Sequence, residues 1–258
     1  VPSQIVCRIM GVPDEDRELF SRWTAARTNA FFAKFLPAEI IASLVQAGND
    51  MADYFDVMVK ARRKDLKDDL ISELIRAEEG GDRMLDGEIV VQAIGIIVAG
   101  FETTIGLIGN GTRALVEHPD QLALLRERPD LTNNCIEECL RYDTPILFNW
   151  RVLREPYQID DVQIPADAVV WQMLACANRD PRQFNDPDRF QIGRKDVAHL
   201  SFGGGSHFCL GNMLAKVEGR VAISRFAEAT KNLRIEPGEA TWSPSFFRVL
   251  GSYPITFK

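Results

Sequence analysis

The sequence contains few cysteines, and their positions do not suggest a disulfide scaffold. There are five in 258 residues, at positions 7, 135, 139, 176 and 209, and neither their odd number nor their spacing fits a set of paired bridges. We therefore expect reduced thiols in a reducing compartment, which means a cytoplasmic protein. No second Cys or His stands at zinc-finger spacing from Cys209, so zinc is not the expected partner of that sulfur.

Basic residues are also in short supply. Lys and Arg number 30 against 37 for Asp and Glu, which gives a formal net charge of −7 and a pI near 5.1. That balance argues against nucleic acid as a partner. A basic-then-apolar leader is missing after Val1, so we expect the chain to begin inside a longer parent or after processing.

One apolar run is long enough to raise the question of a membrane. Residues 89–109 contain a single charged side chain, Glu102, and by length alone this run could cross a bilayer. Glu102 and the neighbouring pair Thr103-Thr104 are costly in lipid. The run therefore predicts the central helix of a large core, over about 88–117, in a protein without a membrane.

Helical periodicity dominates the first half of the chain, and short strands follow. The patterns predict helices at about 14–30, 37–64, 88–117, 119–127 and 131–142. Alternating apolar residues predict strands between 146 and 171. The fold class is therefore mainly α with small β-sheets (α+β). We expect one domain over residues 1–258, in which a helical region (1–145) is followed by a mixed β and loop region (146–200), a cysteine loop and helix (201–230) and a C-terminal β-hairpin (231–258).

A glycine-rich loop near the end of the chain carries Cys209. Residues 202–211 read Phe-Gly-Gly-Gly-Ser-His-Phe-Cys-Leu-Gly, and its four glycines let the backbone pass close to a bulky group. A helical pattern begins just after Cys209, so the sulfur is expected near a helix N-terminus, where the thiolate is favoured. These residues alone are compatible with a nucleophile, a redox sensor, a metal ligand or a buried structural cysteine.

The apolar helix is interrupted by the sextet Ala99-Gly100-Phe101-Glu102-Thr103-Thr104. Its small residues form a notch, and a threonine hydroxyl bonded to a carbonyl one turn earlier can bend the helix there. A buried carboxylate such as Glu102 is costly unless it has a partner or a task. The alternative interpretation is a close helix–helix contact with a structurally paired glutamate.

The pattern Phe-x-x-Gly-x-His-x-Cys-x-Gly, at residues 202–211, resembles the haem-binding loop of the cytochromes P450, where a Cys thiolate holds the iron. The sextet at 99–104 resembles the oxygen-activating helix motif of that family. Glu138-Cys139-Leu140-Arg141 resembles its Glu-x-x-Arg motif, and Pro187-Asp188-Arg189-Phe190 resembles the element whose arginine closes a buried ion network. The resemblance covers the whole chain but begins late, which implies a P450-like fold that is N-terminally truncated.

The resemblance also implies roles for individual residues. Cys209 would be the metal ligand, as the axial ligand of haem b (iron protoporphyrin IX), and Glu102 and Thr103 would be the catalytic pair that delivers protons. Arg151 and His207 would contact the haem propionates. The full set of cofactor-binding residues implied is Ala99, Arg151, Phe202, Gly203, His207, Cys209 and Gly211.

The function implied is a haem-thiolate monooxygenase that inserts one oxygen atom of O2 into an apolar small molecule, held near Ala99, Leu147 and Phe148. Electrons would come from a ferredoxin and its reductase, with Lys216 as a contact for the donor. Two alternatives are a peroxide-driven haem peroxygenase and a non-catalytic haem-binding fragment. Because the region missing from the N-terminus would leave apolar surface exposed, we also predict a homo-oligomer that covers it.

Overall fold

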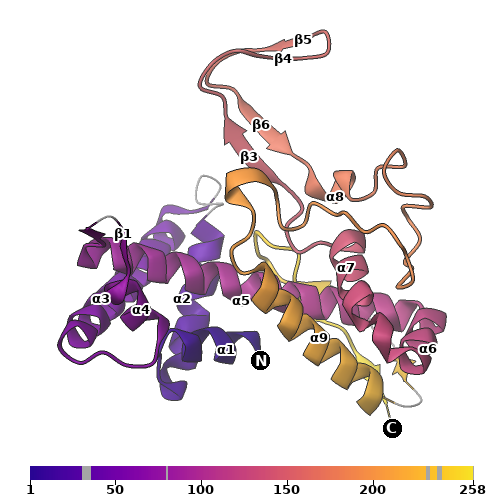
Figure 1. Ribbon diagram of the computed structural model, residues 1–258, viewed down its shortest axis with the longest axis horizontal. Helices are drawn as coiled ribbons and strands as arrows, with labels where there is room; N and C mark the ends of the chain where they lie inside the picture. The colour runs from indigo at the N-terminus through magenta and orange to yellow at the C-terminus, as the bar shows by residue number, and fades with distance from the viewer. Residues whose placement is uncertain (31–35, 80, 231–232, 237–239, 258) are drawn as a thin grey trace. The chain divides into compact units, whose positions relative to one another are not determined.

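The chain folds into two compact units (Figure 1). Unit 1 comprises Val1–Ile105 with Pro244–Phe246, and unit 2 comprises Gly106–Ser243 with Phe247–Lys258. The computed structural model describes residues 1–30, 36–79, 81–230, 233–236 and 240–257. The helical region predicted over 1–145 and the hairpin predicted over 231–258 therefore extend in places outside the described residues, and the single domain expected over 1–258 stays a prediction.

Unit 1 is built from helices. They are α1 (Pro2–Ile9), α2 (Arg17–Asn29), α3 (Ala38–Lys64), α4 (Leu70–Arg76) and the first turns of α5 (Asp86–Glu117), with one antiparallel pair, β1 (Glu78–Glu79) and β2 (Asp82–Arg83). The side chain of Asp69 caps α4 by accepting the Ser72 N–H at 2.8 Å, as expected for an N-cap aspartate. The helices predicted at 14–30, 37–64 and 88–117 are confirmed to within three residues at each end.

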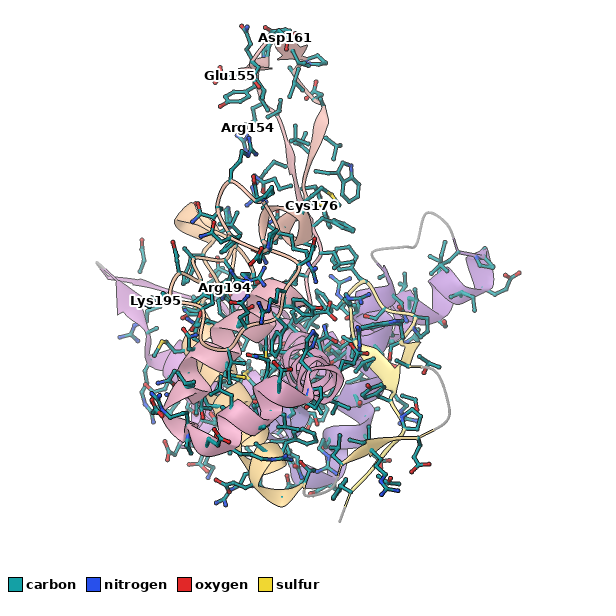
Figure 2. The ribbon with its side chains drawn as sticks, turned by 90° about the vertical axis from the view of Figure 1, so that its right-hand side faces the viewer. Arg154, Glu155, Asp161, Cys176, Arg194 and Lys195 are labelled. Atoms are coloured by element: carbon teal, nitrogen blue, oxygen red, sulfur yellow. The ribbon has the colours of Figure 1, made fainter. Side chains whose placement is uncertain are left out.

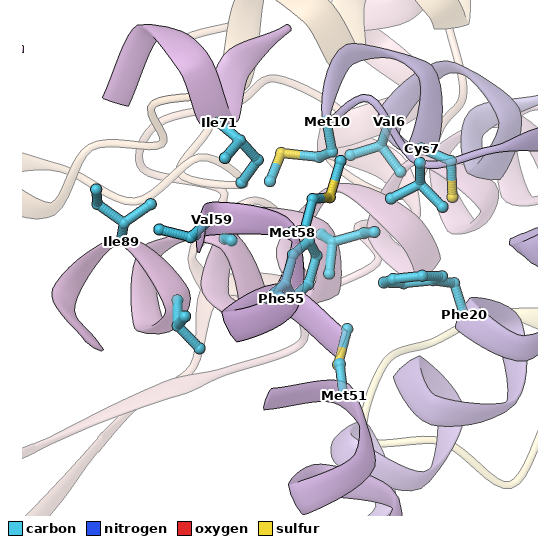
Figure 3. Close-up of a cluster of buried hydrophobic side chains, with 14 of the residues drawn as sticks. Val6, Cys7, Met10, Phe20, Met51, Phe55, Met58, Val59, Ile71 and Ile89 are labelled. Atoms are coloured by element: carbon cyan, nitrogen blue, oxygen red, sulfur yellow. The ribbon is translucent and has the colours of Figure 1, made fainter. Parts of the chain in front are cut away.

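The core of unit 1 is aromatic and aliphatic (Figure 3), and residues of α5 take part in it. The Phe20 ring meets the Phe55 ring edge-on, with centroids 5.4 Å apart. From α5, Ile89, Ile97 and Phe101 are buried in this cluster. By length and composition alone α5 could also cross a membrane, but the buried helix of a large core meets the same criteria.

Unit 2 contains the rest of α5 together with α6 (Pro119–Glu127), α7 (Thr132–Tyr142), α8 (Leu174–Ala177) and α9 (Asn212–Ala229). Two glycines allow close helix contacts. A Cβ at Gly219 would lie 3.1 Å from Leu107, and one at Gly111 would lie 3.0 Å from the Cys139 sulfur. Cys139 is buried in this core together with Cys135, so both cysteines are packing residues.

A β-arm leaves unit 2 between α7 and α8 (Figure 1). Its base is β3 (Asn149–Val152) paired with β6 (Val169–Gln172), and its tip is β4 (Tyr157–Ile159) paired with β5 (Val162–Ile164), both antiparallel. Figure 2 shows Asp161 at the far end of the arm and Cys176 at its base. At the tip, Asp160 adopts φ 51°, a left-handed conformation that aspartate tolerates better than most residues.

One face of the arm is apolar and open to solvent. Trp150 stands opposite Trp171 in the base, and because paired residues share a face, the neighbouring pair Val152 and Val169 lies beside them. All four side chains are exposed, as are Tyr157, Ile159 and Val162 toward the tip. Contiguous exposed apolar side chains of this kind are typical of interaction surfaces.

The tail forms two antiparallel strand pairs. β7 (Arg234–Ile235) pairs with β10 (Ile255–Thr256), and β8 (Thr241–Trp242) pairs with β9 (Leu250–Ser252). Arg248 fastens the tail to the end of α7, because its guanidinium binds the Asp143 carboxylate and lies 3.6 Å from the Trp242 ring centroid.

Candidate functional site

The glycine-rich loop reverses direction, so that Cys209 lies beside Phe202, the first residue of the loop. Gly203 and Gly205 adopt φ 71° and 64°, left-handed values that a side chain would disfavour. The reversal lets the Cys209 N–H donate to the Phe202 carbonyl at 2.9 Å. Asn212 opens α9 and its side-chain amide donates to the Cys209 carbonyl at 2.8 Å. The predicted position of the cysteine, just before a helix, is confirmed.

Burial of Cys209 opposes the thiolate that the sequence predicts there, and the thiolate stays a prediction. Burial raises the pKa of the half-buried Cys209 thiol above its ordinary value, and a hydrogen bond from the Gly211 N–H offsets this only in part. The physical reason is burial, and Cys209 lies three residues before the first residue of α9, outside the helix whose dipole would favour the thiolate. A thiolate here therefore depends on a cation, and a coordinated metal ion deprotonates a thiol outright.

The surroundings of Cys209 fit a large flat apolar group. Phe208 and Leu210, on either side of it, are 52% and 90% exposed. Among the described residues, nothing would come within 4 Å of a Cβ built at Gly204 or Gly211. No cluster of three or more His, Cys, Asp or Glu in the described portion of the chain could hold a metal ion. A single thiolate with open space around it is compatible with a metal whose other ligands come from a macrocycle.

The other predicted cofactor contacts of unit 2 leave their polar ends accessible. Arg151 is exposed on β3 and donates to the neighbouring Trp150 carbonyl at 2.8 Å. His207 is exposed in the single turn Gly205–His207, and Phe202 is half-buried against the core. Accessible cationic and polar groups suit the binding of carboxylates, so the propionate roles of Arg151 and His207 stay predictions.

The notch of α5 lies in unit 1. The Thr103 hydroxyl donates to the Ala99 carbonyl one turn earlier, which confirms the predicted back-bond. Glu102 has a partner, because the Ser245 hydroxyl donates to its Oε2 at 2.5 Å. Burial raises the pKa of Glu102 and the Ser245 hydrogen bond lowers it less, so this carboxyl keeps its proton to a higher pH than an exposed glutamate.

The alternative interpretation of the sextet also has support. A Cβ at Gly100 would lie 3.3 Å from the Val6 side chain of α1, so a small residue is needed at this helix contact. The structure thus explains why a small residue stands at Gly100, and it places the Glu102 carboxyl in a half-buried environment that raises its pKa. Ala99, Glu102 and Thr103 share unit 1, whereas the residues of unit 2 are Arg151, Phe202, Gly203, His207, Cys209 and Gly211.

A buried ion network connects α7 to the segment before the cysteine loop. Arg141 donates to both carboxylate oxygens of Glu138, at 2.7 and 2.9 Å, and both side chains are completely buried. The predicted pair is confirmed, but the predicted third member is wrong. The Arg189 side chain is exposed, and only its backbone carbonyl takes part, as an acceptor for Arg141. The third member is Arg194 (labelled in Figure 2), whose Nε lies 3.2 Å from Oε2 of Glu138.

The fold and the site together define a haem-thiolate type of protein, with one cysteine sulfur presented by a glycine loop. A model of the family described as "Cytochrome P450" matches residues 15–229. The chain is 37% identical over 257 residues to the biotin biosynthesis cytochrome P450 of Bacillus subtilis (strain 168), covering 99% of this chain and 65% of that protein. It is 37% identical over 263 residues to the cytochrome P450 monooxygenase PikC of Streptomyces venezuelae, covering 100% and 61%.

A solved structure agrees with these relatives. The chain matches P450BioI, crystallised in complex with an acyl carrier protein ligated to hexadec-9Z-enoic acid, with a TM-score of 0.93 and 36% identity, covering 100% of this chain and 66% of that one. The chain belongs to the cytochrome P450 family, whose members bind haem b, and its fold is that of the family. It spans about 60 to 65% of the length of the relatives it matches.

Proposed function

We propose that this chain is the haem-carrying portion of a bacterial-type monooxygenase, which inserts one oxygen atom of O2 into an apolar small molecule. The observation that carries the proposal is the half-buried Cys209, held by its N–H on the Phe202 carbonyl and flanked by exposed apolar side chains. Relatives named as a monooxygenase and as a hydroxylase support the reaction class.

The residues of the chain hold the cofactor and deliver protons, and the haem, when bound, supplies the oxygen activation. Cys209 would hold the metal from one side and raise its electron density. Glu102, whose pKa is raised by burial, would deliver protons through Thr103 and water. Arg151 and His207 would hold the propionates, with Ala99, Phe202, Gly203 and Gly211 as further cofactor contacts.

The substrate class we propose is an apolar small molecule, held near Ala99, Leu147 and Phe148. The fatty acyl chain in the P450BioI complex supports an apolar substrate. The uncharged side chains of Ala99, Leu147 and Phe148 would be compatible with such a molecule. Electrons would come from a ferredoxin and its reductase, and the acidic net charge of −7 supports a protein that does not bind nucleic acid.

Replacing Glu102 by glutamine should uncouple oxygen consumption from product formation. The amide can still accept the Ser245 hydrogen bond but cannot transfer a proton, so we expect coupled product formation to fall about 100-fold, within the usual range for a lost general acid. In the unaltered chain, product formation should decrease as pH rises through the raised pKa of Glu102. The variant should lose that dependence. Oxygen uptake and product yield, measured across the acidic to alkaline range with ferredoxin and reductase, test both expectations.

The control is Glu117→Gln, which removes an ion pair with Arg113 at the far end of the same helix and should leave coupling unchanged. Turnover with peroxide but not with reduced ferredoxin would show the peroxygenase alternative instead. Haem binding without turnover, with peroxide or with reduced ferredoxin, would show that the chain is a non-catalytic haem-binding fragment.

We further propose that the chain forms the homo-oligomer predicted to cover the surface left by the missing N-terminal region, and that the exposed apolar side chains of the β-arm contribute to this interface. Trp171 and Val169 on the base and Ile159 and Val162 on the tip are all about half exposed, and exposed apolar side chains grouped on one element are typical of interaction surfaces. Sedimentation should show mass increasing with concentration, and Trp171→Arg should shift the equilibrium toward monomer. A constant monomer mass over the whole concentration range would contradict the proposal.

A further inference from the structure

Behind the cysteine loop, three polar side chains from separate segments of unit 2 meet. Glu137 of α7 pairs through Oε1 with the Lys216 ammonium of α9 at 2.8 Å, and its Oε2 lies 3.1 Å from Nε2 of His199. The His199 side chain is 4% exposed, and those of Glu137 and Lys216 are 27% and 29% exposed. This is a largely buried cluster, unlike the ion pairs of the open surface.

The hydrogen bonds of the cluster define its protonation. The Ser201 N–H donates to Nδ1 of His199 at 3.1 Å, so in the neutral imidazole Nε2 carries the proton and donates it to Glu137. Burial raises the pKa of Glu137, but the hydrogen bonds from His199 and Lys216 outweigh it and hold the pKa below its usual value. The carboxylate is therefore ionised, and both of its oxygens are occupied.

The cluster surrounds the ring of Phe202. The His199 ring is tilted against it with centroids 5.7 Å apart, and the Lys216 ammonium lies 5.3 Å from its centroid, within the range of a cation–π interaction. The carbonyl of Phe202 accepts the Cys209 N–H. The side chain held by the cluster thus belongs to the residue that anchors the backbone of the cysteine.

We propose that Glu137, His199 and Lys216 are positioning residues for Cys209. They hold Phe202 from two sides, Phe202 holds the Cys209 backbone, and the sulfur is thereby kept where it can meet a metal ion. The inference rests on the proposed function in treating Cys209 as a haem ligand, but the hydrogen bonds that carry it are formed between residues of the chain itself. Lys216, which the sequence predicts as a contact for an electron donor, binds Glu137 and the Phe202 ring within the chain.

Alkylation of Cys209 in the haem-free, full 258-residue chain tests the proposal without any turnover. Cys176→Ser removes the exposed cysteine, and Cys139, buried in α7, reports global unfolding in the same sample. Losing the cluster should open the loop more often, so Glu137→Gln and Lys216→Met should each label Cys209 about tenfold faster, the factor that ~1.4 kcal/mol represents. Labelling of Cys139 should stay unchanged, and Lys216→Arg should restore the slow rate.

The two variants change the local charge in opposite directions, which separates positioning from electrostatics. Losing the Lys216 cation alone would disfavour the thiolate and slow labelling, whereas losing the Glu137 anion alone would speed it. Faster labelling in both variants supports the proposal. Opposite changes, rates equal to those of the control Glu228→Gln on α9, or parallel acceleration at Cys139 would each overturn it.

A second measurement uses the haem-loaded chain. The reduced, carbon-monoxide-bound form should show a smaller share of the red-shifted, thiolate-type band in Glu137→Gln and Lys216→Met, by roughly the 10- to 100-fold change in ligand affinity typical of outer-shell partners. Lys216→Arg should recover it. A normal band in both variants would count against the positioning role, whereas failure of turnover in the unaltered chain with a normal band would count against the proposed function alone.

Discussion

Cys209→Ser should abolish thiolate ligation and with it any turnover. Serine keeps the size of the side chain and the backbone hydrogen bond to Phe202, but its hydroxyl is a much weaker metal ligand than a thiolate. Loss of a ligand should exceed the roughly 10- to 100-fold effect of losing an outer-shell partner, so the red-shifted band of the reduced, carbon-monoxide-bound protein should vanish. The absorption spectrum after addition of haemin is the measurement.

Cys176 supplies the matched control for this prediction. It lies exposed on α8 in the same unit, so Cys176→Ser makes the identical chemical change away from the glycine loop and should leave the spectrum unaltered. An unchanged band in Cys209→Ser would mean that another group holds the metal, and the assignment of the site would fail.

Glu138→Ala should cause the largest loss of stability in unit 2. The substitution leaves the buried guanidinium of Arg141 and the nearly buried one of Arg194 without their shared carboxylate. Breaking a buried ion pair by removing one partner costs about 3–5 kcal/mol, which is a large share of the ~5–15 kcal/mol that folds a typical domain. Urea denaturation followed by far-ultraviolet circular dichroism should show a much lower midpoint.

The chain contains a control with the same sequence separation. Arg225 and Glu228 form an i, i+3 ion pair on α9, at 80% and 65% side-chain exposure, where such pairs contribute at most about 1 kcal/mol. Glu228→Ala should therefore shift the midpoint little. Equal shifts in Glu138→Ala and Glu228→Ala would show that the buried network does not hold unit 2 together.

The local patterns of the sequence predicted the elements that carry the site. The glycines before Cys209 and the helical periodicity after it determine the loop and the start of α9, because backbone freedom and side-chain spacing act over a few residues. The same holds for the Glu138 and Arg141 pair, since three residues along a helix place both on one side. The back-bond of Thr103 follows in the same way.

Partners distant in the chain could not be predicted. Ser245 is 143 residues from Glu102, and Arg194 is 56 residues from Glu138, and neither stands at a spacing that a helix or strand would impose. Their positions depend on the path of irregular segments through the folded protein. The raised pKa of the Cys209 thiol likewise depends on burial, which the spacing of glycines does not reveal.

The β-arm also gives the protein a built-in optical reporter. Two of its four tryptophans, Trp150 and Trp171, face each other across the base with ring centroids 5.8 Å apart and are 37% and 55% exposed. Water around an indole relaxes its excited state and moves its emission to longer wavelength. A partner that bound over the arm would exclude that water. Binding would then shift the tryptophan fluorescence of an unlabelled sample toward the blue.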